Sequence, residues 1–262
     1  MKLKTFIVAF ALAVALFLFG QRHTSAAPKP EFRTVLDLTH TISEKSPNWE
    51  GSAKSPYSAS NLSQIEKDGY FTRNISLPEH FSTHIDAPAH FVRGAWTVDQ
   101  IPPTRLIGPL VVLDVTAKVK QSPDYRVSAE DIAAWEQAHG EIPGGAIVMV
   151  QTGWSEHWNS MKDYRHADAA GALHFPGYSL DAARFLVESR NVVGLGIDTL
   201  SVDYGPAKDF PVHHYTAAHG VYHLENVADL WRVPATGSIV MVAPAKLEGG
   251  SGGPVRILAL VR

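Results

Sequence analysis

Three histidines and one aspartate lie within a single short stretch, HFSTHIDAPAHF at positions 80–91. They are His80, His84, Asp86 and His90. Imidazole nitrogens and carboxylate oxygens are ligands that proteins offer to Zn²⁺ and Mn²⁺. A single histidine is more often an ordinary core or surface residue than a ligand. The density of such residues in this stretch is what indicates a metal site.

The spacing of these residues requires a bend if they bind one ion. All four positions are even, so a straight strand would point them to one face. That strand would also set His80 and His84 about 13 Å apart, too far for two imidazoles bound at about 2 Å. Pro88 disfavours a helix across the stretch. We therefore expect the chain to bend near Phe81 and Ser82.

A second cluster of the same residue types follows in HHYTAAHGVYHLE, positions 213–225. It comprises His213, His214, His219, His223 and Glu225. The alternative interpretation is a solvated polar loop that leads into a strand over 220–227. Alternation along that strand would place His223 and Glu225 on one face. Spacing alone does not decide which of the histidines would bind a metal.

Composition narrows the possible functions. The chain has 262 residues and no cysteine, which excludes disulfides, thiolate metal sites and a cysteine nucleophile. Residues 1–26 are typical of a secretory signal peptide cleaved after Ala26, with a retained membrane anchor as the alternative. Removing them leaves 20 basic residues against 26 acidic ones, so the net charge moves from −3 to −6. That balance argues against nucleic acid as a partner.

The rest of the chain reads as one domain over residues 27–262. Short runs rich in β-branched residues predict buried strands at 32–39, 110–117, 146–152, 192–198, 238–244 and 255–261. Helices are predicted over 128–140, where Ser128 and Asp131 have capping-box spacing, and over 179–191. Strands and helices do not alternate strictly. We therefore expect an α/β domain with a mixed sheet, open or curled into a barrel and flanked by helices.

The residues from His80 to His90 also carry a resemblance to a known family. The pattern H-x-S-T-H-x-D-x-P-x-H resembles the H-x-G-T-H-x-D-x-P-x-H motif of the cyclase-like metal hydrolases, which include bacterial kynurenine formamidase and isatin hydrolase. Further similarity covers almost all of the chain after the leader, at 37–49, 150–154, 175–179, 196–203 and 252–260. It implies a fold of the swivelling β/β/α type.

The resemblance implies roles for individual residues. The metal ligands it implies are His80, His84, Asp86, His213 and Glu225, with Asp86 able to bridge two ions. His90 would be the catalytic acid and base, and Trp49 would line the substrate pocket. The family has glycine where this chain has Ser82, and a turn with positive φ there would strain a serine.

The implied reaction is hydrolysis of a non-peptide C–N bond by metal-activated water, with one or two Zn or Mn ions per chain. The substrate would be an N-formyl arylamine, as for kynurenine formamidase, or a small cyclic aryl amide, as for isatin hydrolase. An exported protein that holds metal without turnover is the alternative from another class, although the presence of His90 favours the enzyme. We expect a periplasmic or secreted homo-oligomer, dimer or tetramer, with no membrane contact beyond the export signal.

Overall fold

The computed structural model describes residues 32–262, which form one compact unit. The predicted leader, residues 1–26, lies outside the described residues. Within residues 32–262 there is no helix with the length and apolar character needed to cross a bilayer.

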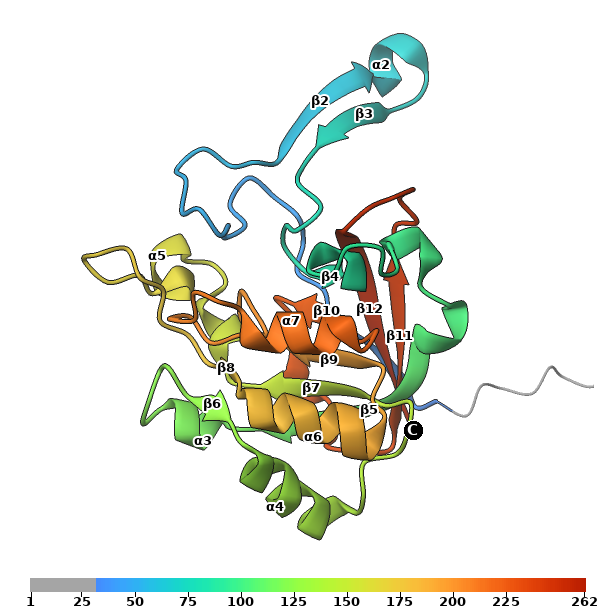
Figure 1. Ribbon diagram of the computed structural model, residues 1–262. Helices are drawn as coiled ribbons and strands as arrows, with labels where there is room; N and C mark the ends of the chain where they lie inside the picture. The colour runs from blue at the N-terminus through green and yellow to red at the C-terminus, as the bar shows by residue number, and fades with distance from the viewer. Residues whose placement is uncertain (1–31) are drawn as a thin grey trace, which may run out of the picture. The chain divides into compact units, whose positions relative to one another are not determined.

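The core of the fold is a closed barrel of mixed strands (Figure 1). Neighbours around it are, in order, β12 (Gly252–Val261), β11 (Ser238–Pro244), β5 (Ile107–Asp114), β7 (Ile147–Gln151), β9 (Gly194–Ile197), β10 (Tyr222–Glu225) and β4 (His84–Asp86). Strand β4 pairs back onto β12, which closes the ring, and β1 (Thr34–Asp37) pairs with the far end of β12. The strands from β5 to β10 run parallel and the others antiparallel. This arrangement confirms the expected mixed sheet and selects its barrel form.

Side chains along the barrel strands alternate between two hydrophobic cores. On β5, Leu110 and Val112 belong to the core inside the barrel, whereas Val111 and Leu113 belong to the core under the helices. This is the period of two that a strand imposes on its side chains. Both cores are apolar, so the strands buried on both faces appear in the sequence as continuous apolar runs.

Helices cover the outer face of the barrel (Figure 1). Helix α4 (Ala129–His139) begins with the predicted capping box, in which the Ser128 side chain accepts from the backbone N–H of Asp131. Helix α6 (Leu180–Arg190) begins after Ser179, whose side chain caps it in the same way. Helix α7 (Pro211–Ala218) lies beside α6 and carries the first histidines of the second cluster.

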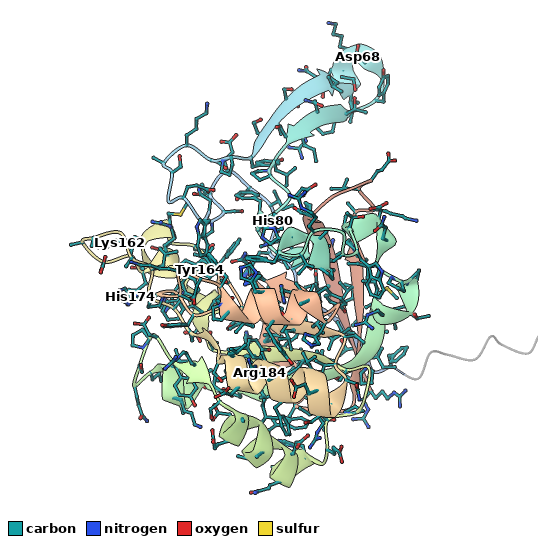
Figure 2. All side chains as sticks on the ribbon, in the orientation of Figure 1. Asp68, His80, Lys162, Tyr164, His174 and Arg184 are labelled. Carbon is teal, nitrogen blue, oxygen red and sulfur yellow. The ribbon has the colours of Figure 1, made fainter. Side chains whose placement is uncertain are left out.

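A hairpin of β2 (Ser58–Ser63) and β3 (Thr72–Ser76), joined through α2 (Ile65–Asp68), projects away from the barrel, with Asp68 near its tip (Figures 1 and 2). The other elements are short and connect the barrel strands. They are η1 (Pro88–His90), η2 (Val98–Gln100), η3 (Pro103–Arg105), α3 (Thr116–Val119), β6 (Arg126–Val127), η4 (Trp154–His157), α5 (Met161–Arg165), β8 (Gly177–Tyr178) and η5 (Leu230–Arg232).

The pairing of β4 with β10 joins the two polar clusters. The strands are antiparallel, with Asp86 opposite His223 and His84 opposite Glu225. Ile85, between the two ligand-type residues of β4, lies in the core inside the barrel. The polar side chains therefore point to the other face of the sheet, toward α7. Segments more than a hundred residues apart thus supply one site.

Candidate metal centre

Asp86 lies at the centre of the polar cluster and is almost completely buried. Its Oδ1 atom lies 2.6 Å from Nδ1 of His80 and 3.2 Å from Nε2 of His84. Its Oδ2 atom lies 3.2 Å from Nε2 of His213 and 3.8 Å from Nδ1 of His223. The two oxygens of one carboxylate therefore face different pairs of histidines.

Glu225 faces Asp86 across the same group of rings. Its Oε2 lies 3.4 Å from Nε2 of His84, and its Oε1 lies 3.2 Å from Nε2 of His213. The backbone N–H of Val202 donates to Oε1 at 2.9 Å, which fixes the carboxylate in place. The structure therefore brings together all five residues that the resemblance implied as ligands, while their role as ligands stays a prediction.

Hydrogen bonds hold the rings with one nitrogen turned toward the carboxylates. His84 donates from Nδ1 to the carbonyl oxygen of Ser82 at 2.9 Å. His213 donates from Nδ1 to Oδ2 of Asp203 at 2.7 Å. In each ring the outer nitrogen donates to its acceptor, so Nε2 is turned toward Asp86 and Glu225, where it can carry a proton or bind a cation. Metal-binding histidines in proteins are oriented in this way by a carbonyl or carboxylate on the other nitrogen.

His80 is oriented through a relay of two side chains (its place on the chain leading into β4 is labelled in Figure 2). The Ser251 hydroxyl donates its proton to Glu79 at 2.7 Å, so its oxygen accepts from Nε2 of His80 at 2.9 Å. The remaining nitrogen, Nδ1, then faces Asp86.

The pKa values in the cluster reflect two buried carboxylates among several imidazoles. Burial would raise the pKa of Asp86, but the surrounding histidines, His84 foremost, outweigh it and hold that pKa well below its ordinary value. Burial also opposes protonation of His84, yet Asp86 and Glu225 raise its pKa to about 9. Burial opposes protonation of His213 as well, but its hydrogen bonds to carboxylates, that to Asp203 foremost, outweigh burial and raise its pKa. The cluster therefore attracts positive charge, which protons or a divalent cation can supply.

The donor atoms fit a divalent metal. Two triads, His80–His84–Asp86 and Asp86–His213–His223, each have their ligand atoms within 4.8 Å of one another, and they share Asp86. The donors are nitrogen and oxygen only, which suits Zn²⁺ or Mn²⁺. Among residues 32–262 the buried Nδ1 of His223 has no hydrogen-bond partner, and this nitrogen beside Asp86 fits a cation as its partner.

His90 lies beside the cluster, at the end of η1. Its ring stacks on that of His80 with the centroids 3.9 Å apart. Desolvation by the neighbouring groups lowers the pKa of His90 to about 4, although its side chain remains open to solvent. His90 is therefore accessible at the edge of the site, where a proton could be exchanged with a bound molecule. Its role as acid and base stays a prediction.

A cavity of about 470 Å³ opens onto the polar cluster. Its wall includes the rings of Trp49, Phe91 and Phe210, and its floor includes His84, Asp86 and Glu225. Phe210 lies 6.1 Å from Trp49 and 5.7 Å from Phe91, measured between ring centroids. Aromatic walls above a charged floor suit a small planar ligand with a polar edge.

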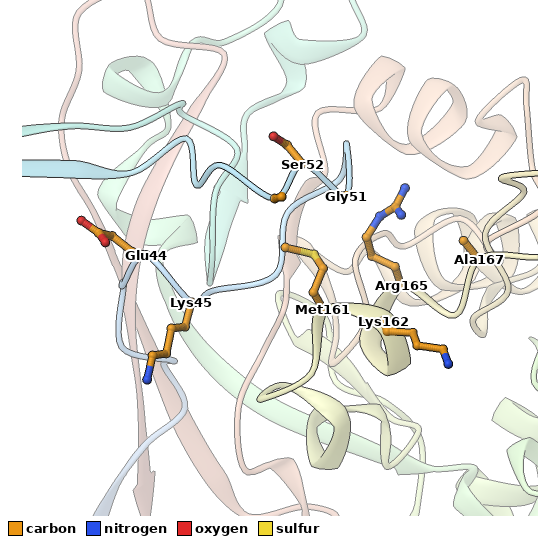
Figure 3. A pocket seen from close by; sticks show the side chains of 9 residues that line it. Glu44, Lys45, Gly51, Ser52, Met161, Lys162, Arg165 and Ala167 are labelled. Atoms are coloured by element: carbon orange, nitrogen blue, oxygen red, sulfur yellow. The ribbon is translucent and has the colours of Figure 1, made fainter.

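Trp49 is 40 % exposed, and its loop is fixed by α5. The backbone N–H of Asn48 donates to Sδ of Met161 at 3.4 Å, and Nε of Arg165 donates to the carbonyl oxygen of Trp49 at 3.0 Å. Figure 3 shows Met161 and Arg165 beside this loop, next to Gly51. The contacts of this loop with α5 thus hold Trp49 in the wall of the cavity. Its role in substrate binding stays a prediction.

Ser82 occupies the expected bend. Its φ is +60°, in the left-handed region that favours glycine. Its carbonyl oxygen accepts from His84 and also from Nδ2 of Asn226, at 2.8 Å, so the bent backbone links the two clusters. The Ser82 hydroxyl is buried and has no hydrogen-bond partner.

Several residues that support the site were not identified from the sequence. Asp203 lies in the segment 196–203 that carries part of the resemblance, but nothing local indicates that it would orient a histidine ten positions later. Ser251 and Asn226 carry no pattern at all. His214 and His219, two of the open candidates of the second cluster, have exposed side chains.

Comparison with known proteins agrees with this architecture. The Cyclase family matches residues 36–204. An isatin hydrolase of Roseibium aggregatum is 36 % identical over 210 residues, covering 76 % of this chain and 79 % of that protein. A kynurenine formamidase of Salinibacter ruber is 24 % identical over 222 residues, covering 85 % of this chain and 95 % of that protein.

Solved structures agree as well. Isatin hydrolase A from Ralstonia solanacearum superposes with a TM-score of 0.81 at 32 % identity, covering 97 % of each chain. The α/β barrel with its few helices is thus the fold of isatin hydrolases. Because the family matches well over half of the sequence, the chain belongs to the Cyclase family of hydrolases, with isatin hydrolase and kynurenine formamidase among its relatives.

Proposed function

We propose that this protein is a metal-dependent hydrolase that opens the ring of a small cyclic aryl amide such as isatin. The observation that carries the proposal is the position of the Asp86 and Glu225 carboxylates, with their oriented histidines, on the floor of an aromatic cavity. The 36 % identity to an isatin hydrolase supports this substrate class. Hydrolysis of an N-formyl arylamine is the second candidate, supported by the kynurenine formamidase relative.

The residues that would hold the metal are His80, His84, Asp86, His213 and Glu225. A divalent ion bound there lowers the pKa of a water molecule toward neutrality and polarises a carbonyl group. The chain prepares the site before an ion binds, because Asp86, His84 and His213 are buried and both imidazole rings are already oriented. Orientation before binding reduces the entropic cost of forming the site.

The aromatic side chains orient the substrate. A planar bicyclic amide would lie against the rings of Trp49, Phe91 and Phe210 that line the cavity, with its amide edge toward the metal-binding residues on the floor. Ring stacking of this kind fixes the plane of the substrate without fixing its identity. Such positioning converts the attack of water into a step within one complex.

His90 handles the proton. Water adds to the amide carbonyl carbon, the C–N bond breaks, and the amide nitrogen leaves with a proton as an arylamine. His90, open to the cavity and stacked on His80, takes the proton from water and returns it to the nitrogen. A positioned acid and base of this kind contributes about 10²- to 10⁴-fold to the rate.

The test is a hydrolysis screen of chelator-stripped protein to which Mn²⁺ or Zn²⁺ is returned separately, with isatin and an N-formyl arylamine as substrates. The proposal expects metal-dependent ring opening of isatin. In the same assay, His90→Gln should lower kcat about 10²- to 10⁴-fold while leaving the bound metal unchanged.

His214→Gln is the matched control, because His214 is exposed like His90 and contacts the Phe91 ring, with centroids 4.9 Å apart, but does not line the cavity. Turnover of the N-formyl arylamine alone would overturn the ring-opening proposal in favour of the formamidase. Tight metal binding with turnover of neither substrate would indicate a binding protein.

We also propose export and self-association. The leader pattern of residues 1–26 supports a periplasmic or secreted location, which cell fractionation tests. The hairpin of β2 and β3 supports a homo-oligomer, because it exposes Leu62, Ile65 and Ile75. Light scattering should give a mass that is a multiple of the single chain, and a monomer at micromolar concentration would count against the oligomer.

A further inference from the structure

Ser82 lines the cavity with a hydroxyl group that has no partner. It lies in the wall of the cavity that opens onto the polar cluster, and it is 1 % exposed. Within residues 32–262, six residues have a buried side-chain nitrogen or oxygen without a hydrogen-bond partner, and Ser82 is the one of these six that lines this cavity. A buried hydroxyl without a partner destabilises the fold. A ligand bound in the cavity can supply the missing partner.

The backbone of Ser82 carries a second cost. Its φ of +60° lies in the left-handed region, where a residue with a Cβ atom is strained and glycine is not. The glycine of the family motif would therefore remove the strain and the unpaired hydroxyl together. Residues held in such conformations persist where the surrounding structure fixes them, and they cluster at active sites and ligand-binding sites. Two costs on one residue of a cavity wall indicate a function for its side chain.

Hydrogen bonds fix the backbone from which this hydroxyl projects. The carbonyl oxygen of Ser82 accepts from Nδ1 of His84 at 2.9 Å and from Nδ2 of Asn226 at 2.8 Å. The next residue, Thr83, donates its hydroxyl proton to the carbonyl oxygen of Asn226 at 2.6 Å and accepts from the backbone N–H of His40 at 2.9 Å. The hydroxyl therefore sits on rigid backbone beside the metal-binding residues. A group held in place before binding loses little freedom when it pairs with a ligand.

The polar groups around Ser82 leave it as a free neutral donor. Asn226 already uses its amide group, since Nδ2 donates to the Ser82 carbonyl and Oδ1 accepts from the Tyr164 hydroxyl at 2.9 Å. Asp86 and Glu225 carry negative charge that repels the oxygen of a bound ligand unless a cation lies between them. The Ser82 hydroxyl has one proton that it can donate to such an oxygen. A carbonyl group of the ligand is therefore the partner that suits it.

We propose that the Ser82 hydroxyl determines specificity by donating a hydrogen bond to a carbonyl oxygen next to the scissile amide. Isatin has such an oxygen, because its ketone lies beside the amide carbonyl in the same planar five-membered ring. The amide carbonyl would face the metal-binding residues, and the ketone would face Ser82. The inference rests on the proposed function. It names within that function the substrate class, which is cyclic aryl amides with a second carbonyl group beside the amide.

The test is a thermodynamic cycle between the Ser82 hydroxyl and the ketone oxygen of the ligand. Isatin and 2-oxindole, the same bicycle without the ketone oxygen, are titrated by calorimetry into the chelator-stripped full chain, where the proposed turnover cannot occur. The wild type should bind isatin about 10-fold more tightly than 2-oxindole. Ser82→Ala keeps the Cβ atom and its strain but lacks the hydroxyl, so the two ligands should bind it about equally.

Ser238→Ala is the matched control. Ser238 also has a buried hydroxyl without a partner, but it lies in β11 and does not line the cavity. This variant should keep the preference for isatin. Ser82→Gly covers the case in which Ser82→Ala fails to fold, because glycine also removes the hydroxyl and is unstrained at this φ. It should lose the preference as Ser82→Ala does.

The inference is overturned if the wild type binds the two ligands equally or binds neither, or if the preference survives in both Ser82 variants. Survival would mean that a trapped water molecule pairs with the hydroxyl. A protein that prefers isatin through Ser82 but hydrolyses neither isatin nor the N-formyl arylamine would contradict the proposed function and support the role of Ser82. A metal-dependent isatin hydrolase whose preference ignores Ser82 would do the reverse.

Discussion

The two segments that form the metal centre are built differently. In the segment 80–90 the ligand-type residues are close in sequence, and His84 is oriented by a backbone carbonyl, that of Ser82. In the segment 213–225 they lie on a helix and a strand, and both buried histidines are oriented by side chains, Asp203 and Thr216. The first half therefore depends on the path of the chain at His84 and on the Ser251 side chain at His80, whereas both buried histidines of the second half depend on side chains that a point substitution can remove.

Asp86 belongs to both halves, so its loss should have the largest effect. Asp86→Asn replaces a carboxylate oxygen by an N–H group that repels cations, and it affects all four nearby histidines. We expect the bound metal to be lost and kcat/KM to fall about 10³-fold or more, since a catalytic metal contributes several kcal/mol. Metal analysis and hydrolysis assays measure the two losses.

Asp198→Asn is the control for this change, because Asp198 is equally buried, at 1 % exposure, and its carboxylate accepts from Thr152 and Gly153. It should retain the metal. If Asp86→Asn retained metal at wild-type affinity, the two segments would not share Asp86 as a ligand, and the comparison between them would fail.

Acid should destabilise the fold next to the first segment, because the buried His40 ring resists protonation. The backbone N–H of His40 donates to Thr83 at 2.9 Å, and the His40 ring stacks on Trp158 at 3.9 Å between centroids. Burial lowers the pKa of His40 to about 4, against a weaker opposing effect of Asp229. In the unfolded chain His40 is protonated below about pH 6.5, whereas in the folded chain it is protonated only near pH 4. Stability is therefore lost as pH falls across this window, by about 3 kcal/mol at most.

His40→Phe keeps a stacking ring and removes the titration. Urea unfolding of metal-free protein at pH 7 and pH 4.5 should show a smaller loss of stability in this variant than in the wild type. His139→Phe, an exchange at an exposed histidine, controls for the added ring. Equal losses in wild type and His40→Phe would show that burial of His40 plays no part in acid sensitivity.

Asp203 provides the direct test of the second segment. Its carboxylate accepts from Nδ1 of His213 at 2.7 Å and from the backbone N–H groups of Val212 and His213. Asp203→Asn should weaken metal binding about 10- to 100-fold, because it removes the carboxylate that orients His213. Mn²⁺ titration of the chelator-stripped protein measures the affinity.

The exposed Asp209 lies in the same loop, and Asp209→Asn is the matched control that should bind as the wild type does. Unchanged metal affinity in Asp203→Asn would mean that the second half of the site does not depend on the side chain that orients His213.

The difference between local features and contacts of distant segments explains how much of the fold and site the sequence could predict. Strands β1, β5, β7, β9, β11 and β12 were predicted because apolar runs are local, whereas β4 was not predicted as a strand. The start of α4 was predicted because Ser128 and Asp131 lie three residues apart. The bend that gathers the ligand-type residues of the first segment was predicted because these residues are close together in the sequence. Closure of the barrel through β4 and β12, and the pairing of His84 with Glu225, arise only when distant strands meet. For the same reason the orienting roles of Asp203 and Thr216 were missed, since each becomes meaningful only beside a folded partner.

The smallest expected effect concerns the backbone of the first segment. Ser82 has φ +60° and a buried hydroxyl without a partner, two features that cost stability. Ser82→Gly should therefore raise the free energy of unfolding by about 1 kcal/mol, after the entropy that glycine adds to the unfolded chain is subtracted. The midpoint of urea unfolding measures the change.

Ser238→Gly is the matched control, because Ser238 is also buried with an unpartnered hydroxyl but lies in strand β11. There glycine should destabilise the fold by about 0.5–1 kcal/mol. Opposite signs at the two serines would show that the path of the chain, and not the hydroxyl, sets the cost at Ser82. Destabilisation by Ser82→Gly would instead mean that the serine side chain helps to hold the bend from which His84 reaches Asp86.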